Sequence, residues 1–404
     1  MLKIAFRNVF RNRRRSVLSL AIIGLGSTML FLVGGYVAQS LASMTTGFSS
    51  YYGHIQIADI GFWDRSDELS DYLLRPLGRL ATIERVLAEH PIVESWTTRL
   101  DFSGLLGNDK ETAMVLGTGV EPENLTTEPV HPIAVSGRPL RANRSDEILL
   151  GVTLAENLDA LPGSRINLAG FAVTESLNAM TIDVAGTFKF FNSEMEAQAT
   201  FVPLALAQGL LRTDGVDRVI VRLSESTAVE ATATSIQASF DQEGLDLEVR
   251  PWEDIAPFYT EMKSFYGAID GLSTVAVFLL AFFGILQVLM MSFMERTREV
   301  GTLRAIGTKR SQVFRMFLTE GVVLGILGGL LGVAAGFGIG AAINAADIVW
   351  MYPGATQPAP VAIQLAAGNA LAPLIIGLLA ALLSAVYPAL NAARSDVVEA
   401  LHHV

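Results

Sequence analysis

The residue types that could carry out catalysis are sparse in this chain, and their spacing matches no common catalytic pattern. The absence of cysteine excludes thiol nucleophiles, disulfides and thiolate zinc sites. The histidines form no HExxH pattern and no spacing typical of a shared metal; they are His54, His90, His131, His402 and His403. No Gly-x-Ser-x-Gly nucleophile elbow occurs. We therefore expect no catalytic residue, metal ligand or cofactor in this chain.

One segment does combine charged and small residues densely. Residues 301–309 (GTLRAIGTK) hold glycines and a lysine, but a phosphate-binding loop needs Gly-Lys followed by Ser or Thr, and this segment has Gly-Thr-Lys. The surrounding residues 294–317 are too few for a domain. Gly301, Ala305 and Gly307 stand in a helix-like register, which predicts one short helix presented to a partner. An ordinary basic loop that only fixes membrane topology is the alternative.

Four long apolar stretches must position this segment. A helix needs about 20 apolar residues to cross a bilayer core of about 30 Å, and only helices satisfy their backbone in lipid. The stretches that qualify are residues 17–39, 271–293, 321–346 and 366–390. A cleavable signal peptide is the alternative for the first, but its 23 residues exceed the usual signal core of about 7 to 15 residues.

The basic residues near the ends of these spans predict their orientation, because cytoplasmic loops are enriched in Lys and Arg. Those before the first span are Lys3, Arg7, Arg11, Arg13, Arg14 and Arg15. Those between the second and third spans are Arg296, Arg298, Arg304, Lys309, Arg310 and Arg315. The loop at 347–365 has no base. We therefore expect the segment at 294–318 and both termini, including the tail at 391–404, in the cytoplasm, and residues 40–268 outside.

The first residues predict an additional element at the membrane surface. In residues 1–16, apolar side chains share one helical face and basic ones repeat every four residues on another. This pattern is typical of a helix lying along anionic headgroups. A positive topology anchor is the simpler alternative, and both can hold.

The large insert between the first and second spans differs from the spans in its charge and in the short length of its predicted elements. Residues 40–270 hold 34 acidic and 16 basic residues, in a chain of net charge −11, a balance that excludes a generic nucleic-acid binder. Short strand-like and helical runs alternate, which predicts an α+β domain or two subdomains, with the turn-rich residues 121–144 as the internal boundary. Residues 252–270 predict a helix that continues into the second span.

Glycines recur at four-residue spacing in the third span, at Gly321, Gly325 and Gly329 and again at Gly332, Gly336 and Gly340. Small residues at this spacing let helix backbones approach closely, so we expect a helix pair or a subunit interface there. The alternative is that glycine is merely common in membrane helices.

One run closely resembles the coupling segment of the FtsX/MacB/LolC-LolE family of ABC transporter permeases. It reads Glu295-Arg296-x-Arg298-Glu299-Val300-Gly301-x-Leu303-Arg304-Ala305-Ile306-Gly307. The start of the chain (residues 5–8 and the arginines after them) and its end (residues 387–401) are similar to other family signatures. Gly137-Arg138, residues 147–151 and residues 163–166 look like the family's periplasmic core domain. The resemblance covers essentially the whole chain.

The resemblance implies a membrane protein with four transmembrane α-helices and a large α+β extracytoplasmic domain inserted between helices 1 and 2. It implies a bacterial inner-membrane permease that works by mechanotransmission, with ATP and Mg bound by a separate cytoplasmic ATPase dimer. A second permease copy, identical or paralogous, and a periplasmic or outer-membrane acceptor would complete it. The residues implied in the ATPase contact are Glu295, Arg298, Glu299, Gly301, Leu303, Arg304, Ala305 and Gly307.

In that contact Gly301 and Gly307 would allow close approach, Leu303 would be the buried knob, and Glu299 and Arg304 would pair with opposite charges. The resemblance leaves the substrate open. Extraction of a lipoprotein or another amphipathic substrate is the first expectation. A signal relay to a cell-wall hydrolase, as in FtsX-type systems, and MacB-like efflux are the alternatives. An intramembrane enzyme is disfavoured because the spans contain no acid, base or histidine pair.

Overall fold

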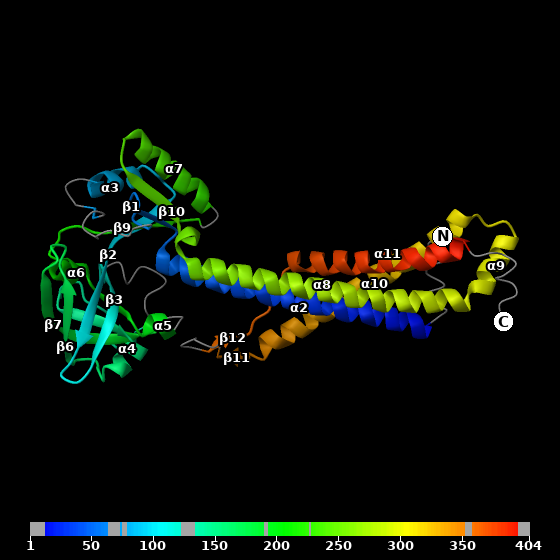
Figure 1. Ribbon diagram of the computed structural model, residues 1–404, viewed down its shortest axis with the longest axis horizontal. Helices are drawn as coiled ribbons and strands as arrows, with labels where there is room; N and C mark the ends of the chain where they lie inside the picture. Colours follow the sequence, from blue (N-terminus) through cyan, green and yellow to red (C-terminus); the bar gives the residue numbers. More distant parts are fainter. Residues whose placement is uncertain are drawn as a thin grey trace. The chain divides into compact units, whose positions relative to one another are not determined.

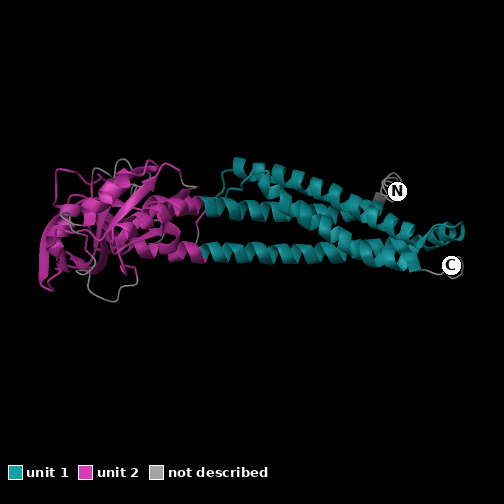
Figure 2. Cartoon of the chain, turned by 90° about the horizontal axis from the view of Figure 1, so that it is seen from above, with its two compact units in different colours: residues 1–42, 262–349, 360–404 teal, residues 43–261, 350–359 magenta. Residues whose placement is uncertain are grey.

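The computed structural model describes residues 13–63, 73–74, 79–122, 134–189, 193–225, 228–351 and 358–394. The chain divides into two units (Figure 2). The helical unit holds residues 1–42, 262–349 and 360–404, and the mixed unit holds residues 43–261 and 350–359. Residues 1–12 of the predicted interfacial helix and residues 395–404 of the tail lie outside the described part.

The described residues of the helical unit include four long helices, which Figure 1 shows. They are α2 (Arg13–Tyr52), α8 (Pro257–Glu295), α10 (Arg310–Ala345) and α11 (Gly368–Arg394). Each is long and apolar enough to cross a membrane, so the four predicted apolar helices are present. A short helix, α9 (Thr297–Ala305), separates α8 from α10, and β11 (Val349–Trp350) pairs with β12 (Ala359–Pro360) before α11.

Helix α8 is a single element from the mixed unit to the end of the second apolar stretch. It starts at Pro257, where proline is well suited because the first helical N–H has no intrahelical partner. The preceding residues form a 3₁₀ turn, η5 (Trp252–Ile255). The predicted continuous helix is therefore confirmed from Pro257 onward. Both α2 and α8 include residues of both units.

The glycines of α10 lie against two different neighbours. A Cβ added at Gly321 would lie 2.7 Å from the Cβ of Ala385. A Cβ added at Gly325 would lie 3.0 Å from the Cβ of Ala381, and a Cβ added at Gly329 would lie 3.1 Å from the Leu374 side chain. This first group therefore faces α11. A methyl group at Gly321 would therefore force a shift of α10 or α11, and one at Gly325 or Gly329 would be tightly packed.

The second group faces α2 and the segment before α11. A Cβ at Gly332 would lie 2.4 Å from the carbonyl oxygen of Gly24, and the Thr28 hydroxyl donates to the carbonyl oxygens of Gly24 and Gly332, at 2.8 Å each. A Cβ at Gly336 would lie 2.7 Å from the Phe31 ring. At Gly340 it would lie 2.8 Å from a methyl group of Leu365.

The mixed unit contains ten strands and five further α-helices among its described residues. The strands are β1 (Ile55–Asp59), β2 (Val93–Gly107), β3 (Thr112–Val120), β4 (Ala134–Gly137), β5 (Glu147–Gly151), β6 (Arg165–Phe171), β7 (Leu177–Phe188), β8 (Ala199–Pro203), β9 (Arg218–Leu223) and β10 (Leu247–Pro251). The helices are α3 (Ala81–Ala88), α4 (Val152–Asn157), α5 (Ser193–Glu196), α6 (Leu204–Leu211) and α7 (Val229–Gln242).

Six of these strands close into a barrel. The pairings run β2–β3–β8–β5–β7–β6 and back from β6 to β2. Two pairs, β3 with β8 and β5 with β7, are parallel, and the rest are antiparallel. Strand β4 pairs with β7 in the antiparallel direction and is not one of the six strands of the closed ring. The barrel core consists of alternating apolar residues such as Leu106, Ile148 and Ile182, and α6 packs on it through Leu206 and Leu210.

The other half of the mixed unit is an antiparallel sheet in the order β2–β9–β1–β10. Helices α3 and α7 supply Ile83, Ile236 and Phe240 to its core. Strand β2 belongs to both halves, since its first residues pair with β9 and its later residues with β3 and β6. The predicted boundary at 121–144 was wrong, because β3 before it and β4 after it both pair within the barrel part.

Candidate functional site

The segment between α8 and α10 forms a compact turn–helix–turn. Helix α8 ends at Glu295, Arg296 leaves the helical conformation at φ −103° and ψ 7°, and α9 begins at Thr297. At the other end, the Thr308 N–H donates to the Leu303 carbonyl and the Gly307 N–H to the Arg304 carbonyl, both at 3.1 Å. These two bonds are a Schellman motif.

Gly307 is explained by this helix end. Its φ of +100° is a left-handed conformation that other residues rarely adopt, and a Cβ there would meet nothing within 4 Å. Its role in this chain is the reversal between α9 and α10. A close approach to a partner at this residue remains an expectation from the resemblance.

One face of α9 packs inside the helical unit. Thr297, Val300, Gly301 and Arg304 follow the i, i+3, i+4, i+7 spacing of one helical face. Val300 is 1% exposed, Gly301 is buried, and the Arg304 guanidinium donates to the Ala393 carbonyl at 3.4 Å. The apolar cluster beneath Val300 contains Val313, Met316 and Phe317 of α10 and Ala389 and Ala392 of α11. Gly301 therefore lies toward this chain's own core, not on the outer face.

The opposite face of α9 is open. Its exposed residues are Arg298, Glu299, Thr302 and Ala305. Leu303 is 36% exposed, and Ile306, just after the helix, is 76% exposed. Two apolar side chains among charged and polar ones at the end of a short helix form a small surface suited to a protein partner. Glu295, also expected in the ATPase contact, forms an ion pair with Arg15 of α2.

A buried ion pair that the sequence predictions did not single out lies beneath α9. The Arg296 guanidinium donates to a Glu299 carboxylate oxygen at 3.2 Å and to a Glu320 carboxylate oxygen at 3.4 Å. It also lies 6.0 Å from the centre of the Phe317 ring. The signal in the sequence was Glu320 itself, an acid directly before an uncharged stretch of 26 residues, Gly321 to Ala346.

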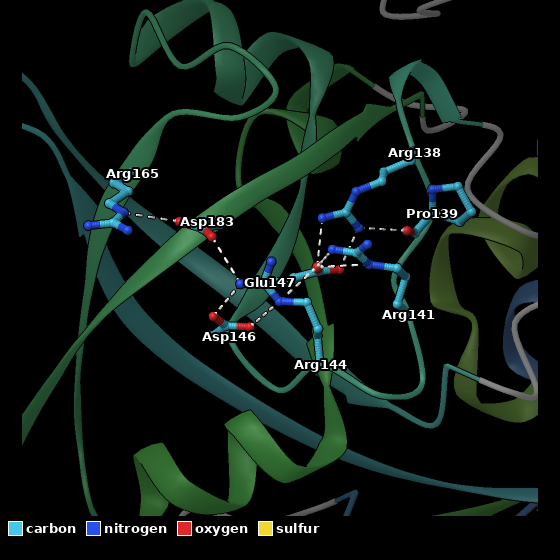
Figure 3. Close-up of polar contacts among 8 residues, drawn as sticks. All are labelled: Arg138, Pro139, Arg141, Arg144, Asp146, Glu147, Arg165 and Asp183. Carbon is cyan, nitrogen blue, oxygen red and sulfur yellow. Dashed lines mark hydrogen bonds and ion pairs between the residues drawn. The ribbon is translucent and has the colours of Figure 1, made fainter.

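In the mixed unit, three arginines converge on one buried carboxylate (Figure 3). The Glu147 side chain, at the start of β5, is 0% exposed. Arg138 donates to both of its oxygens at 2.6 Å, and Arg141 donates to one of them at 2.7 Å. Arg144 forms an ion pair with the same carboxylate, with its Nε 3.3 Å from Oε1. Burial alone would raise the pKa of Glu147, but the hydrogen bonds from Arg138 and Arg141 outweigh burial and lower that pKa. The cluster fixes residues 138–144 to the barrel.

A second charged cluster lies where β2 passes from the sheet into the barrel. Arg218 donates to Asp101 at 2.7 Å, Thr118 donates to Asp101 at 2.8 Å, and the Asp101 N–H donates to Asp217 at 2.7 Å. Burial would raise the pKa of Asp101, but the charge and hydrogen bond of Arg218 lower it. Both clusters are consistent with structural roles in the mixed unit.

The mixed unit also contains a cleft beside the end of α2. Two adjoining cavities, of about 380 and 790 Å³, share Thr45, Ser49 and His54. His54 Nδ1 accepts a hydrogen bond from the Leu223 N–H at 2.9 Å. Burial and then the Arg222 charge lower the pKa of His54. In the described part of the chain, no three His, Asp or Glu side chains are grouped as metal ligands.

Comparisons with known proteins identify both parts of the chain. Residues 16–239 match the model of the MacB-like periplasmic core domain, and residues 271–397 match that of the FtsX-like permease C-terminal region. Over 100% of its length the chain is 24% identical to an uncharacterized ABC transporter permease, YknZ of Bacillus subtilis, and it covers 98% of that relative.

The chain is also 23% identical, over 99% of its length, to the macrolide export ATP-binding/permease protein MacB of Burkholderia cenocepacia, of which it spans 57%. The solved extracellular domain of YknZ matches 49% of the chain and 100% of that domain, with a TM-score of 0.35 at 14% identity. The periplasmic region of MacB from Actinobacillus actinomycetemcomitans matches 54% of the chain and 97% of that region, with a TM-score of 0.37 at 12% identity.

Proposed function

The chain belongs to the family of ABC transporter permeases that join a MacB-like periplasmic core domain to an FtsX-like permease domain, and from this premise we propose that it couples a separate cytoplasmic ATPase to its external domain. The single observation that carries the proposal is that α9 has one buried face and one exposed face. Its inner face is anchored in the helical unit, and its outer face leaves Leu303 and Ile306 open to a partner.

In the proposed orientation α9 lies in the cytoplasm and the mixed unit lies outside. The cytoplasmic side is assigned from the arginines and lysines around α9 and before α2, following the positive-inside rule. The strongly acidic composition of residues 40–270 is in keeping with an external domain. The protein is then a multi-pass inner-membrane protein with both termini in the cytoplasm.

Movement would pass from α9 to the external domain along the long helices. Because α2 and α8 each run from one unit into the other, a tilt of either helix at its cytoplasmic end displaces its outer end as well. One chain offers one α9, so two ATPase sites would need a second permease copy, identical or paralogous.

The substrate class is proposed as an amphipathic molecule moved out of the inner membrane toward an envelope acceptor. Lipoprotein cargo is one candidate. A small exported molecule is equally consistent, because relatives carry the names of macrolide and pyoverdine export proteins. Release of fluorescent lipoprotein or of a macrolide from proteoliposomes distinguishes the two. A change in affinity for a cell-wall hydrolase, without release of either, would support the signal-relay function instead.

The ATPase contact is tested by Ile306→Asp. A charge at the most exposed apolar residue of this surface would have to be desolvated at the interface, so we expect the ATPase recovered with the purified permease to fall about tenfold or more. Ser311→Asp is the matched control, since it adds the same charge at an exposed polar residue of α10. Equal ATPase recovery from both variants would contradict the proposed contact.

A further inference from the structure

Arg296 occupies an unusual place for an arginine. It lies outside both α8 and α9 in its backbone conformation, yet it is only 8% exposed. Its guanidinium donates to Glu299 of α9 at 3.2 Å and to Glu320 of α10 at 3.4 Å. It therefore connects three helices: α8 through the backbone, α9 through one carboxylate and α10 through the other.

Glu320 is also buried, at 6% exposed, and it follows Phe317, a member of the apolar cluster beneath Val300, by three residues on α10. A carboxylate in such a place is unfavourable unless it is paired and hydrogen-bonded. Arginine suits this pairing because its planar guanidinium presents several donors in a fixed geometry, whereas a lysine is a single point charge. The pair therefore specifies an orientation of α9 more narrowly than apolar packing alone.

We propose that Arg296 is the positioning residue that fixes α9 relative to α10, so that a displacement of α9 reaches α10 through Glu320 and α8 through the backbone. This inference rests on the proposed function, in which the outer face of α9 receives the ATPase. The backbone break at residue 296 is what makes the side chain necessary. A continuous helix would set the direction of α9 by itself. At this break the backbone hydrogen bonds are local, such as the Arg296 N–H to the Phe293 carbonyl at 3.0 Å, and the Arg296 side chain adds a direct contact to α10.

The positioning role is tested without the ATPase. Because the chain contains no cysteine, spin labels attach only at introduced sites, here Thr302→Cys on α9 and Ile326→Cys on α10, both exposed. We expect a narrow distance distribution in the full-length protein in lipid nanodiscs. Arg296→Met should broaden it, and Arg296→Lys should give an intermediate width. Arg315→Met, an exposed arginine of α10, is the control and should leave it narrow. An unchanged distribution in Arg296→Met would overturn the proposal.

The double variant Arg296→Met/Glu320→Met separates transmission from folding. Replacing a buried ion pair by apolar residues of similar volume usually preserves the fold, and retention of the monodisperse protein in detergent checks this. In the complex with the co-purified ATPase, we expect the double variant to hydrolyse ATP. It should lose the ATP-dependent distance change between a label at Ile326→Cys and one at Leu161→Cys in the mixed unit.

A double variant with a normal distance change would assign the pair a purely structural role and overturn the inference. If no ATPase co-purifies with the wild-type chain, the proposed function fails, while the Thr302–Ile326 distribution still decides whether Arg296 positions α9. Failure of the inference and failure of the proposed function are thus distinguishable.

Discussion

Glu147 illustrates how single residues hold the mixed unit together. Its carboxylate has no exposure to water, and its partners Arg138, Arg141 and Arg144 reach it from the partly exposed loop that precedes β5. The ion pairs offset the cost of burying the charge. Loss of the charge would therefore leave three arginines without their common partner.

Glu147→Gln should lower the free energy of unfolding of the mixed unit by about 3 kcal/mol, at the lower end of the cost of breaking a buried ion pair because the arginines can turn to solvent. The tryptophans Trp63, Trp96, Trp252 and Trp350 all lie in this unit, so intrinsic fluorescence during denaturation of the full chain in detergent reports its unfolding. Glu156→Gln, at an exposed site on α4, is the control and should change stability by no more than about 0.5 kcal/mol.

The same carboxylate gives a pH dependence of defined sign. Because the pKa of Glu147 is lowered in the folded protein, its contribution is complete above the unfolded pKa of about 4.3 and disappears as the pH falls through the lower folded pKa. The difference in melting temperature between wild type and Glu147→Gln should therefore narrow as the pH falls from 7 toward 3. A difference that stays constant or widens would contradict this account of the cluster.

Among the helices, the glycines of α10 set how closely it approaches its neighbours. Gly332→Ala places a methyl group 2.4 Å from the Gly24 carbonyl oxygen, which must force α2 and α10 apart. We expect a loss of about 1–2 kcal/mol, since overpacking outweighs the gain in helix propensity. The measurement is the fraction of monodisperse protein that remains after heating in detergent.

Gly338→Ala is the matched control for this change. It is on the same helix, and a Cβ there meets nothing within 4 Å. The substitution then changes stability only through the higher helix propensity of alanine, so this variant should be as stable as wild type or more stable by up to about 1 kcal/mol. If Gly332→Ala were as stable as Gly338→Ala, close packing of α2 on α10 would not hold.

The sequence predicted the long helices well because their signal is local. Apolar stretches without charges are visible in any 20-residue window. Residues 252–270 hold no strong breaker apart from Pro257 and Gly267, which indicated that a helix there continues into the second span. Strand β2 has no such local signal. Arg99 and Asp101 interrupt its apolar alternation, and Asp101 is accommodated by Arg218, more than a hundred residues further along the chain. No local pattern contains that pairing.

The candidate site also combines features that the local sequence predicts with features that depend on distant residues. The run at 295–307 was recognisable as a short helix for a partner, but its two faces could not be assigned from residue types alone. The burial of Val300 depends on Phe317 of α10 and Ala392 of α11. The role of Arg296 depends on Glu320, which the sequence places at the edge of a span without indicating its partner.

For the molecule as a whole, the proposed orientation predicts labelling from opposite sides of the membrane. Ile306→Cys and Leu161→Cys are both at exposed side chains, 76% and 71%, in a chain without native cysteine. In sealed right-side-out vesicles, a membrane-impermeant maleimide should label residue 161 immediately and residue 306 only after permeabilisation. Labelling of both residues in sealed vesicles would refute the topology.

The central claim is that ATP turnover by an ATPase bound at α9 moves the external domain. Its most direct test is the distance between spin labels at Ile326→Cys in the helical unit and Leu161→Cys in the mixed unit, in the full complex with its ATPase in nanodiscs. We predict that ATP with vanadate shifts this distance distribution relative to the nucleotide-free complex, and that Ile306→Asp abolishes the shift. An identical distribution in both states, in a complex that hydrolyses ATP, would contradict the account.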